Sequence, residues 1–148
     1  MAKSCSAFGH RTVLGNIDDE LYCMVCKIIE MGCNVFYTGH MGDFDRIFTS
    51  CVRKAKKNYP NRRIKLICVK PYLTKELNEN KQYYYELYDD IIIPEELSGV
   101  YYKNAITKRN QWMIDKSDIV LTYTIINGGG AAASKQYALR HNKLLIEL

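Results

Sequence analysis

The chain has 148 residues, a length typical of one domain, and its 47% apolar and 25% charged residues are ordinary for a protein with a hydrophobic core. The formal net charge of +5 is a modest basic excess, which suits anionic ligands in general but does not by itself indicate nucleic acid. No apolar stretch reaches the roughly 18 residues of a membrane-spanning helix, so we expect no membrane partner.

The first part of the chain contains two strand–helix units. A short apolar run that ends at a glycine predicts a strand at Lys3–Phe8. Asn16 can cap the following helix, in which apolar residues recur at helical spacing until Gly32. A second strand is expected at Asn34–Thr38. A second helix is expected to begin with Asp43 as its N-cap and to end before the first proline of the chain.

The middle of the chain continues this alternation. An apolar run predicts a third strand at Arg63–Lys70, followed by one helix at Thr74–Leu87 and a fourth strand at Asp90–Ile93. The tyrosines in that helix weaken its pattern, because aromatic residues have a low helix propensity. A further helix is expected at Tyr101–Lys116, and a fifth strand at Asp118–Tyr123.

The chain ends with a helix predicted at Ala131–His141 and a strand predicted at Lys143–Glu147. Strands thus alternate with helices throughout, and most strands are continuous apolar runs, as expected when both faces of a sheet are covered. The pattern predicts an α/β fold. We expect one domain, residues 1–148, that forms a Rossmann-like three-layer αβα sandwich around a mainly parallel sheet.

The N-terminus and the cysteines indicate a cytoplasmic protein. The first residues are polar and lack the apolar stretch of a signal peptide, so we expect the six cysteines to be reduced. Cys23 and Cys26 form a C-x-x-C sequence, but they fall inside a helical pattern, and no second pair completes a zinc site. We therefore interpret them as packing residues and expect no metal site.

Candidate ligand-binding residues follow the strands. In an open α/β sheet, ligands bind beyond the carboxyl ends of the strands, and glycines there let the backbone approach a ligand closely. Two of the glycine-rich stretches lead straight into a helix, whose free N–H groups and dipole attract a phosphate. The candidates, in chain order, are Gly9, His10, Arg11, Gly39, His40, Gly42, Asp43, Arg109, Asn110, Gly128, Gly129, Gly130, Ala131 and Ser134.

Several candidates also have a plainer explanation. We interpret Gly128–Gly130 as a phosphate cradle, and the alternative is a tight turn into a helix that packs closely on the sheet. Arg11 either pairs with a phosphate or forms a surface salt bridge. Arg109 either pairs with a phosphate or faces solvent from its helix. His10 either contacts a base or ribose or caps a neighbouring helix. Asp43 either lines the pocket or only caps its helix.

Sequence motifs exclude two common classes of nucleotide-binding protein. The dinucleotide fingerprint G-x-G-x-x-G is missing after the first expected strand, and the Walker pattern G-x-x-x-x-G-K-[ST] is missing from the chain. The sequence is therefore neither that of a typical dehydrogenase nor that of a P-loop ATPase.

Four segments that contain these strand ends share features with a known superfamily. They are CSAFGHR (Cys5–Arg11), FYTGHMGDFD (Phe36–Asp45), KRNQWMIDKSDIVL (Lys108–Leu121) and INGGGAAAS (Ile126–Ser134). Together they resemble the SLOG superfamily, Rossmann-like proteins named after the DNA-processing protein DprA and the LOG phosphoribohydrolases. The nearest branch is the YpsA-like one, which carries TGHR after the first strand, where this chain has FGHR. The resemblance implies a pocket for a nucleotide or a nucleotide-derived ligand such as AMP, NAD or an ADP-ribose derivative.

The resemblance to the LOG enzymes leaves catalysis open. These enzymes remove the base from a nucleoside monophosphate, with an Arg that Arg109 matches and a Glu in a P-G-G-x-G-T-x-x-E motif. Asn127-Gly128-Gly129 matches the Pro-Gly-Gly, which puts Ser134 at the position of the Glu. A serine cannot act as that carboxylate, so an enzyme of this kind would need a carboxylate from another side of the pocket. The candidates for it are Asp43, Asp45 and Glu95.

The sequence therefore supports three hypotheses. The leading one is the binding, with or without processing, of a nucleotide or an ADP-ribose-like ligand. The second is a LOG-like hydrolysis of an N-glycosidic bond in a nucleoside monophosphate. The third is DprA-like nucleic-acid binding, against which the modest net charge and the lack of a clear basic stripe with exposed aromatic residues argue. Family members are often dimers or larger, so the resemblance also implies a homo-oligomer.

Overall fold

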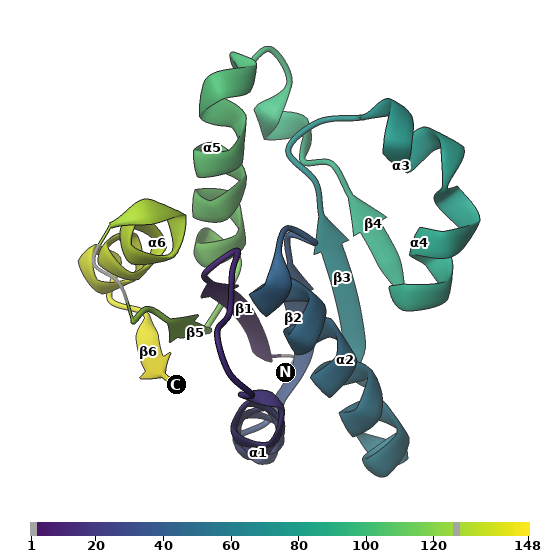
Figure 1. Cartoon of the computed structure of the whole chain (residues 1–148), viewed down its shortest axis with the longest axis vertical. Coiled ribbons are helices and arrows are strands. Elements are labelled where there is room, and N and C mark those ends of the chain that lie inside the picture. Colours follow the sequence, from purple (N-terminus) through teal and green to yellow (C-terminus); the bar gives the residue numbers. More distant parts are fainter. Residues whose placement is uncertain (1–2, 126–127) are drawn as a thin grey trace.

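The computed structural model describes residues 3–125 and 128–148, and it shows one six-stranded parallel sheet (Figure 1). The strands lie in the order β4-β3-β2-β1-β5-β6. Their bounds are Lys3–Gly9 (β1), Cys33–Thr38 (β2), Lys65–Val69 (β3), Asp90–Ile92 (β4), Ile119–Tyr123 (β5) and Leu144–Glu147 (β6). The predicted α/β fold with a parallel sheet is thus confirmed.

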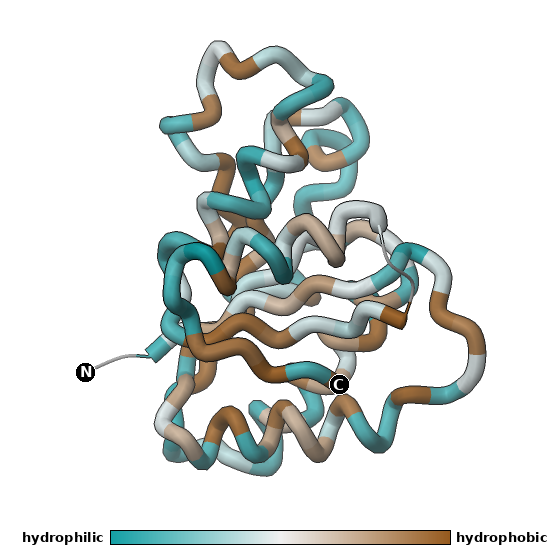
Figure 2. The backbone as a smooth tube through the Cα atoms, turned by 90° about the vertical axis from the view of Figure 1, so that its left-hand side faces the viewer, coloured by the Kyte–Doolittle hydropathy of each residue, from teal (hydrophilic) through white to brown (hydrophobic). Residues whose placement is uncertain are grey.

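Helices cover both faces of this sheet. Their bounds are Asp18–Glu30 (α1), Asp43–Asn58 (α2), Lys75–Glu79 (α3), Lys81–Leu87 (α4), Tyr102–Asp115 (α5) and Gly129–Arg140 (α6), with 3-10 turns at Pro60–Arg62 and Glu95–Leu97. In Figure 2 hydrophobic stretches of strand cross the middle of the molecule between these helices. No helix in the described part of the chain combines the length and the apolar character needed to cross a membrane.

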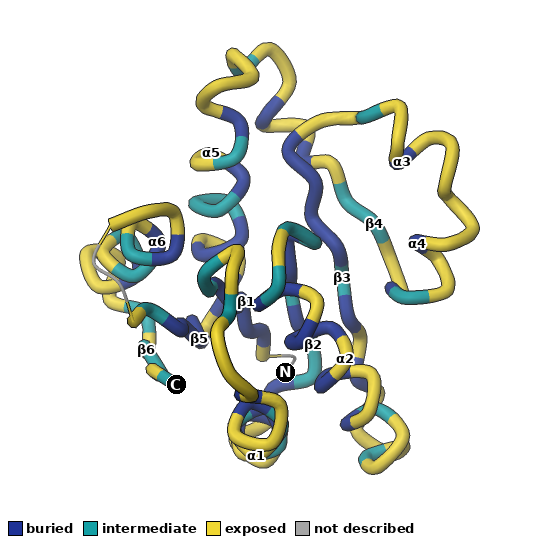
Figure 3. The backbone as a smooth tube through the Cα atoms, in the orientation of Figure 1, coloured by how far each residue is buried: buried dark blue, intermediate teal, exposed yellow. Residues whose placement is uncertain are grey.

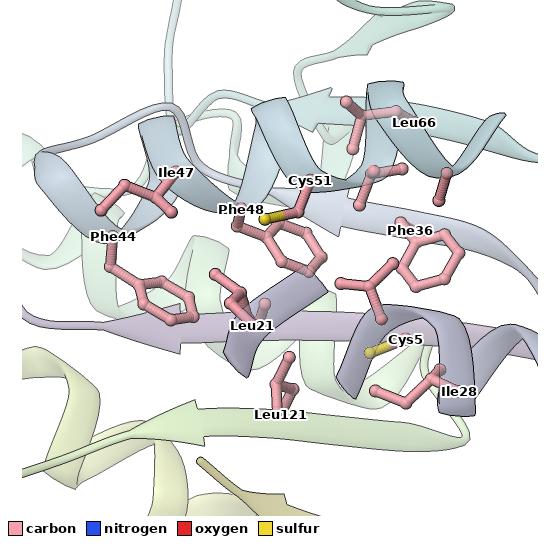
Figure 4. Packing of buried hydrophobic residues seen from close by; sticks show 14 of the residues in the cluster. Cys5, Leu21, Ile28, Phe36, Phe44, Ile47, Phe48, Cys51, Leu66 and Leu121 are labelled. Carbon is pink, nitrogen blue, oxygen red and sulfur yellow. The ribbon is translucent and has the colours of Figure 1, made fainter. Parts of the chain in front are cut away.

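The side chains of the strands alternate between two hydrophobic clusters. Cys5 and Ala7 of β1 lie in the larger cluster, which includes buried residues of α1 and α2, whereas Phe8 lies in the smaller one with residues of α5 and α6. Figure 4 shows Phe44 and Phe48 of α2 beside the sheet in the larger cluster. This period of two is what a strand that is covered on both faces requires. Figure 3 shows the result as buried strands between helices with exposed outer sides.

The helix predicted at Thr74–Leu87 is instead two short helices, α3 and α4, that meet at Asn80. The Asn80 side chain donates to the carbonyl oxygen of Glu76 at 2.7 Å, an interaction that competes with continuation of the helix. Thr74 does cap α3 as expected, since its hydroxyl accepts from the Leu77 N–H at 3.1 Å. The helical prediction is therefore confirmed for both segments, and only the continuity of the helix through Asn80 was wrong.

Two predicted N-caps also differ from the structure. The N-cap of α2 is Gly42, with φ 91°, and Asp43 is the first helical residue. The N-cap of α1 is Ile17, although the Asn16 side chain accepts from the Asp18 N–H at 3.0 Å. The last helix begins at Gly129 rather than at Ala131. In α2 a glycine replaces the expected cap because the backbone enters the helix with a positive φ, which glycine adopts without strain.

Candidate functional site

A pocket of about 340 Å³ opens at the carboxyl end of the sheet, around the ends of the central strands. The chain runs from β1 outward to β4 on one side and returns to β5 on the other, so β1 and β5 are neighbours at the point where the strand order reverses. Ligands of open α/β sheets bind at this switch point. Of the predicted residues, the pocket brings together Gly9, His10, Arg11, Arg109, Asn110, Gly129, Gly130 and Ala131.

Arg109 is the most deeply buried charged group of this pocket. It projects from α5 and is only 2% exposed, so the alternative of a solvent-facing helix position was wrong. Its Nη1 donates to the carbonyl oxygens of Val69 at 2.9 Å and Gly39 at 3.3 Å, and its Nε donates to Oδ1 of Asn110 at 2.8 Å. These bonds fix the guanidinium at the ends of β2 and β3. Burial lowers its pKa, against the attraction of a nearby carboxylate.

Arg11 and Arg109 converge on one sulfur atom. Nη2 of Arg11 lies 3.3 Å from Sδ of Met41, and Nη2 of Arg109 lies 3.8 Å from the same atom. A thioether is a weak, uncharged acceptor, so it neutralises neither cation. Among the described residues, neither guanidinium forms an ion pair within 4.0 Å. The pocket wall therefore carries two positive charges held by neutral acceptors.

Asp45 supplies a carboxylate to the same pocket. It is the third residue of α2, is 8% exposed, and accepts from the Met41 N–H at 2.9 Å. Burial raises its pKa to about 6, although the hydrogen bond from Met41 and the charges of Arg109, Lys70 and Arg11 act in the opposite direction. A carboxyl group with such a pKa can exchange a proton near neutral pH.

The glycines of the site fall into two groups. A Cβ on Gly9 would lie 2.1 Å from the ring of Phe44, and a Cβ on Gly42 would lie 2.6 Å from the Cα of Arg11. A Cβ on Gly39 would meet the Arg109 guanidinium. These three glycines make room for other parts of the protein rather than for a ligand. Gly128–Gly130, by contrast, have no described atom within 4 Å of such a Cβ, and Gly129 and Gly130 line the pocket.

His10 connects two of the loops at the pocket. Its Nε2 accepts from the Ile125 N–H at 2.8 Å, and its ring meets the ring of Tyr123 edge-on at 5.8 Å. It therefore holds the loop after β1 against the chain that leaves β5. Asn127, which the resemblance aligns with a family motif, lies outside the described residues.

The other predicted residues lie away from the pocket lining. The Asp43 carboxylate accepts from the Val13 N–H at 3.0 Å and so fastens the loop after β1. His40 has φ 54° and turns toward α4, where its Nδ1 contacts the Tyr88 hydroxyl and burial lowers its pKa. Glu95 lines a separate groove of about 540 Å³. Ser134 lines a neighbouring pocket of about 250 Å³ between α5 and α6.

Sequence reasoning left four residues of the pocket lining out of the list of binding residues: the apolar Phe8 and Ile106, and Met41 and Asp45. The position of Met41 between His40 and Gly42 was the available signal, because these residues directly follow β2. Asp45 had been considered only as a source of a carboxylate. Its place two residues after Asp43, in the first turn of α2, directs its side chain back to the Met41 N–H.

Three solved structures have the same fold. DNA processing protein A from Helicobacter pylori, described for its single-stranded DNA binding mode, superposes with a TM-score of 0.65 at 16% identity, over 98% of this chain and 64% of that chain. The molybdenum cofactor binding protein from Rippkaea orientalis superposes with a TM-score of 0.60 at 17% identity, over 99% of this chain and 76% of that chain. DprA from Streptococcus pneumoniae superposes with a TM-score of 0.61 at 12% identity, over 99% of this chain and 50% of that chain.

These likenesses show a DprA-like Rossmannoid fold, as the sequence resemblance implied. This chain spans somewhat less than two thirds of the Helicobacter protein and half of the Streptococcus protein. No protein-family model matches the sequence. No curated protein matches it either.

Proposed function

We propose that the protein binds a phosphate-bearing ligand, a nucleotide such as AMP or a derivative of it, in the pocket lined by the end of β1, α5 and the start of α6. The observation that carries this proposal is the burial of Arg109 among neutral hydrogen-bond acceptors. It is 2% exposed, yet each of its described hydrogen bonds goes to a neutral acceptor. A buried charge is costly unless an opposite charge compensates it. Asp45 attracts Arg109 but, among the described residues, forms no ion pair with it within 4.0 Å, so a bound phosphate would add a direct opposite charge. Arg11, which contacts the same Met41 sulfur, would add a second contact.

The start of α6 supports a phosphate in particular. Gly129 and Gly130 line the pocket and begin this 12-residue helix, so its first N–H groups lie beside the ligand without a side chain in between. Free N–H groups and the helix dipole favour a phosphate at this position. The pocket volume of about 340 Å³ lies within the usual range for small-molecule sites. A cofactor-binding protein with the same fold is a further argument for a small-molecule ligand.

Calorimetric titration with AMP tests the proposal. We expect Arg11→Gln to weaken AMP binding at least tenfold, because Arg11 is exposed and its loss removes a charge without disturbing the core. Arg53→Gln on α2 is the matched control, since Arg53 is exposed and does not line the pocket. Equal affinity for all three proteins would rule out a phosphate beside Arg11. Chromatography of the titrated AMP shows whether free base is released, which would indicate hydrolysis with Asp45 as the available carboxylate.

Single-stranded DNA is the second candidate ligand. The fold match to the Helicobacter protein favours it, and so does the groove beside the 3-10 turn at Glu95–Leu97. Tyr72 and Tyr102 line this groove, and they are 39% and 61% exposed, which makes them available to stack on bases. Fluorescence anisotropy with a labelled oligothymidylate tests this candidate. We expect binding that weakens with salt and with Tyr102→Ala, whereas no change in anisotropy at low salt would exclude it.

A further inference from the structure

His40 fastens the loop between β2 and α2 to the segment that carries α3 and α4. Its Nδ1 contacts the Tyr88 hydroxyl, and its ring centroid lies 4.8 Å from that of Tyr84 and 6.3 Å from that of Tyr83. From α2, the Thr49 hydroxyl approaches the same Tyr88 hydroxyl at 3.4 Å. The backbone of His40 has φ 54°, a value that is uncommon for residues other than glycine, so these side-chain contacts hold the loop in a conformation it would not favour alone.

The residues on either side of His40 hold the charged groups of the pocket at the carboxyl end of the sheet. The Gly39 carbonyl oxygen accepts from Nη1 of Arg109 at 3.3 Å. The Met41 N–H donates to Asp45 at 2.9 Å, and the Met41 sulfur lies 3.8 Å from Nη2 of Arg109. His40 itself does not line this pocket. A movement of His40 nevertheless displaces the backbone that positions Arg109 and Asp45.

The hydrogen bond with Tyr88 requires a neutral His40. Tyr88 is 3% exposed, and burial raises the pKa of its hydroxyl, which therefore keeps its proton. Nδ1 of His40 can accept this proton only in the neutral imidazole whose own proton is on Nε2. A proton added at Nδ1 removes the acceptor from the Tyr88 hydroxyl. The contact between loop and helix segment thus depends on the protonation state of one side chain.

The charged groups around His40 also disfavour its protonation. Lys70 directly follows β3, its Nζ lies 5.1 Å from the Tyr84 ring centroid, and no ion pair within 4.0 Å engages it among the described residues. Glu76 of α3 acts in the opposite direction, but it is exposed and accepts from the Tyr84 hydroxyl at 2.6 Å. Burial and, after it, the charge of Lys70 therefore lower the pKa of His40.

We infer that His40 is a pH-sensitive latch: its neutral ring holds the loop of residues 39–42 in the arrangement that forms the pocket, and protonation releases this loop. The inference goes beyond the proposed function, because the release needs no ligand. In the released loop His40 has its ordinary pKa of 6.5, and in the latched loop its pKa is lower. The latch is therefore fully effective above pH 6.5 and weakens as the pH falls toward the pKa of the latched form.

An NMR titration of the histidine imidazoles in the ligand-free protein tests the first requirement. The chain has three histidines, so single substitutions assign each signal. We expect His40 to titrate below pH 6.5 and to carry its proton on Nε2 at pH 7.5. A pKa of His40 at or above 6.5, or a proton on Nδ1 at pH 7.5, would overturn the latch.

Hydrogen exchange of the segment 39–45, measured by mass spectrometry at pH 7.5 and pH 5 and corrected for the intrinsic exchange rate, tests the release itself. We expect the protection of this segment to fall by a factor of about two or more at pH 5. His40→Asn should show low protection that is the same at both pH values, because asparagine is uncharged and tolerates a positive φ. His141→Gln is the matched control, since His141 is exposed and follows α6, and it should behave like the unmodified protein.

Tyr88→Phe keeps the aromatic ring and removes only the hydroxyl, so it tests the latch even if His40→Asn does not fold. We expect it to lower the protection of the segment at pH 7.5 and to reduce the response to pH. Asp45 titrates in all of these proteins, so its contribution cancels in the comparison. The latch is refuted if the unmodified protein and both Tyr88→Phe and the folded His40→Asn protein lose protection equally on acidification.

Discussion

A side chain at residue 39 would occupy the space of the Arg109 guanidinium: a Cβ built on Gly39 lies 2.8 Å from its central carbon. The same guanidinium donates to the Gly39 carbonyl oxygen at 3.3 Å. Gly39, which follows β2, thus leaves the space that the Arg109 guanidinium occupies, and it determines where this positive charge of the pocket lies. This relationship links a local sequence feature to a residue 70 positions away in the chain.

Gly39→Ala should therefore displace Arg109 and weaken ligand binding. The methyl group forces the guanidinium away from the Gly39 and Val69 carbonyls, and loss of these buried hydrogen bonds costs on the order of 1–3 kcal/mol. Urea denaturation measures the free energy of unfolding, and titration with AMP measures affinity. A variant with unchanged stability and unchanged affinity would show that Arg109 moves without consequence.

Gly130→Ala should have the opposite effect on stability. Gly130 lies in the first turn of α6, and a Cβ there meets no described atom within 4 Å. Alanine is the better helix former, so the free energy of unfolding should rise by about 0.5–1 kcal/mol. The added methyl group projects into the space that a phosphate would occupy, so AMP affinity should fall. A gain in stability without a loss of affinity would count against the phosphate cradle.

Arg109→Ala should reduce stability as well as binding. The side chain is buried and donates hydrogen bonds to the carbonyl oxygens of Val69 and Gly39. The substitution removes this donor from both oxygens. We expect a loss of about 1–3 kcal/mol in the free energy of unfolding. Arg11→Gln, at an exposed position, should change it by less than about 0.5 kcal/mol. Similar stabilities of the two variants in urea denaturation would contradict the anchoring role of Arg109.

Asp45→Asn should make stability depend less on pH. In the folded protein the pKa of Asp45 is about 6, raised from 3.8, so the folded state binds this proton more tightly than the unfolded state. Stability contributed by the protonated form is complete below pH 3.8 and is lost as the pH rises through about 6. At pH 7.5 the Asn variant should be more stable by roughly 1–3 kcal/mol. Urea denaturation at pH 7.5 and pH 4 measures this, and a constant difference between the two proteins would refute it.

The same substitution should raise the affinity for anions at neutral pH. The ionised Asp45 lies in the pocket with Arg11 and Arg109, so it repels a phosphate there and partly offsets their attraction. We expect Asp45→Asn to bind ADP-ribose more tightly at pH 7.5 and equally at pH 5, because the pyrophosphate keeps its charge over this range. Weaker binding at both values would mean that Asp45 contacts the ligand directly, for example through a ribose hydroxyl.

The sequence predicted the layers of this protein well, and the identities of the pocket residues only in part. Continuous apolar runs and helical spacing predicted all six strands and the parallel sheet. The positions beyond the strand ends follow directly from that topology, which is why Gly9, His10 and Arg11 were found beside Gly129 and Gly130. The break at Asn80 was missed because helical spacing continues across it, and the side-chain hydrogen bond of Asn80 to the Glu76 carbonyl leaves no trace in that spacing.

By itself, then, the sequence determined the fold class and the end of the sheet at which a site forms, because hydrophobic periodicity acts over a few residues and parallel strands share one carboxyl edge. Only the tertiary structure decided which way the side chains at that edge point. His40 turns to Tyr88, Arg109 turns inward to Gly39, and Asp45 enters the pocket. These directions depend on atoms that are distant in the sequence and close in space, and no local pattern encodes them.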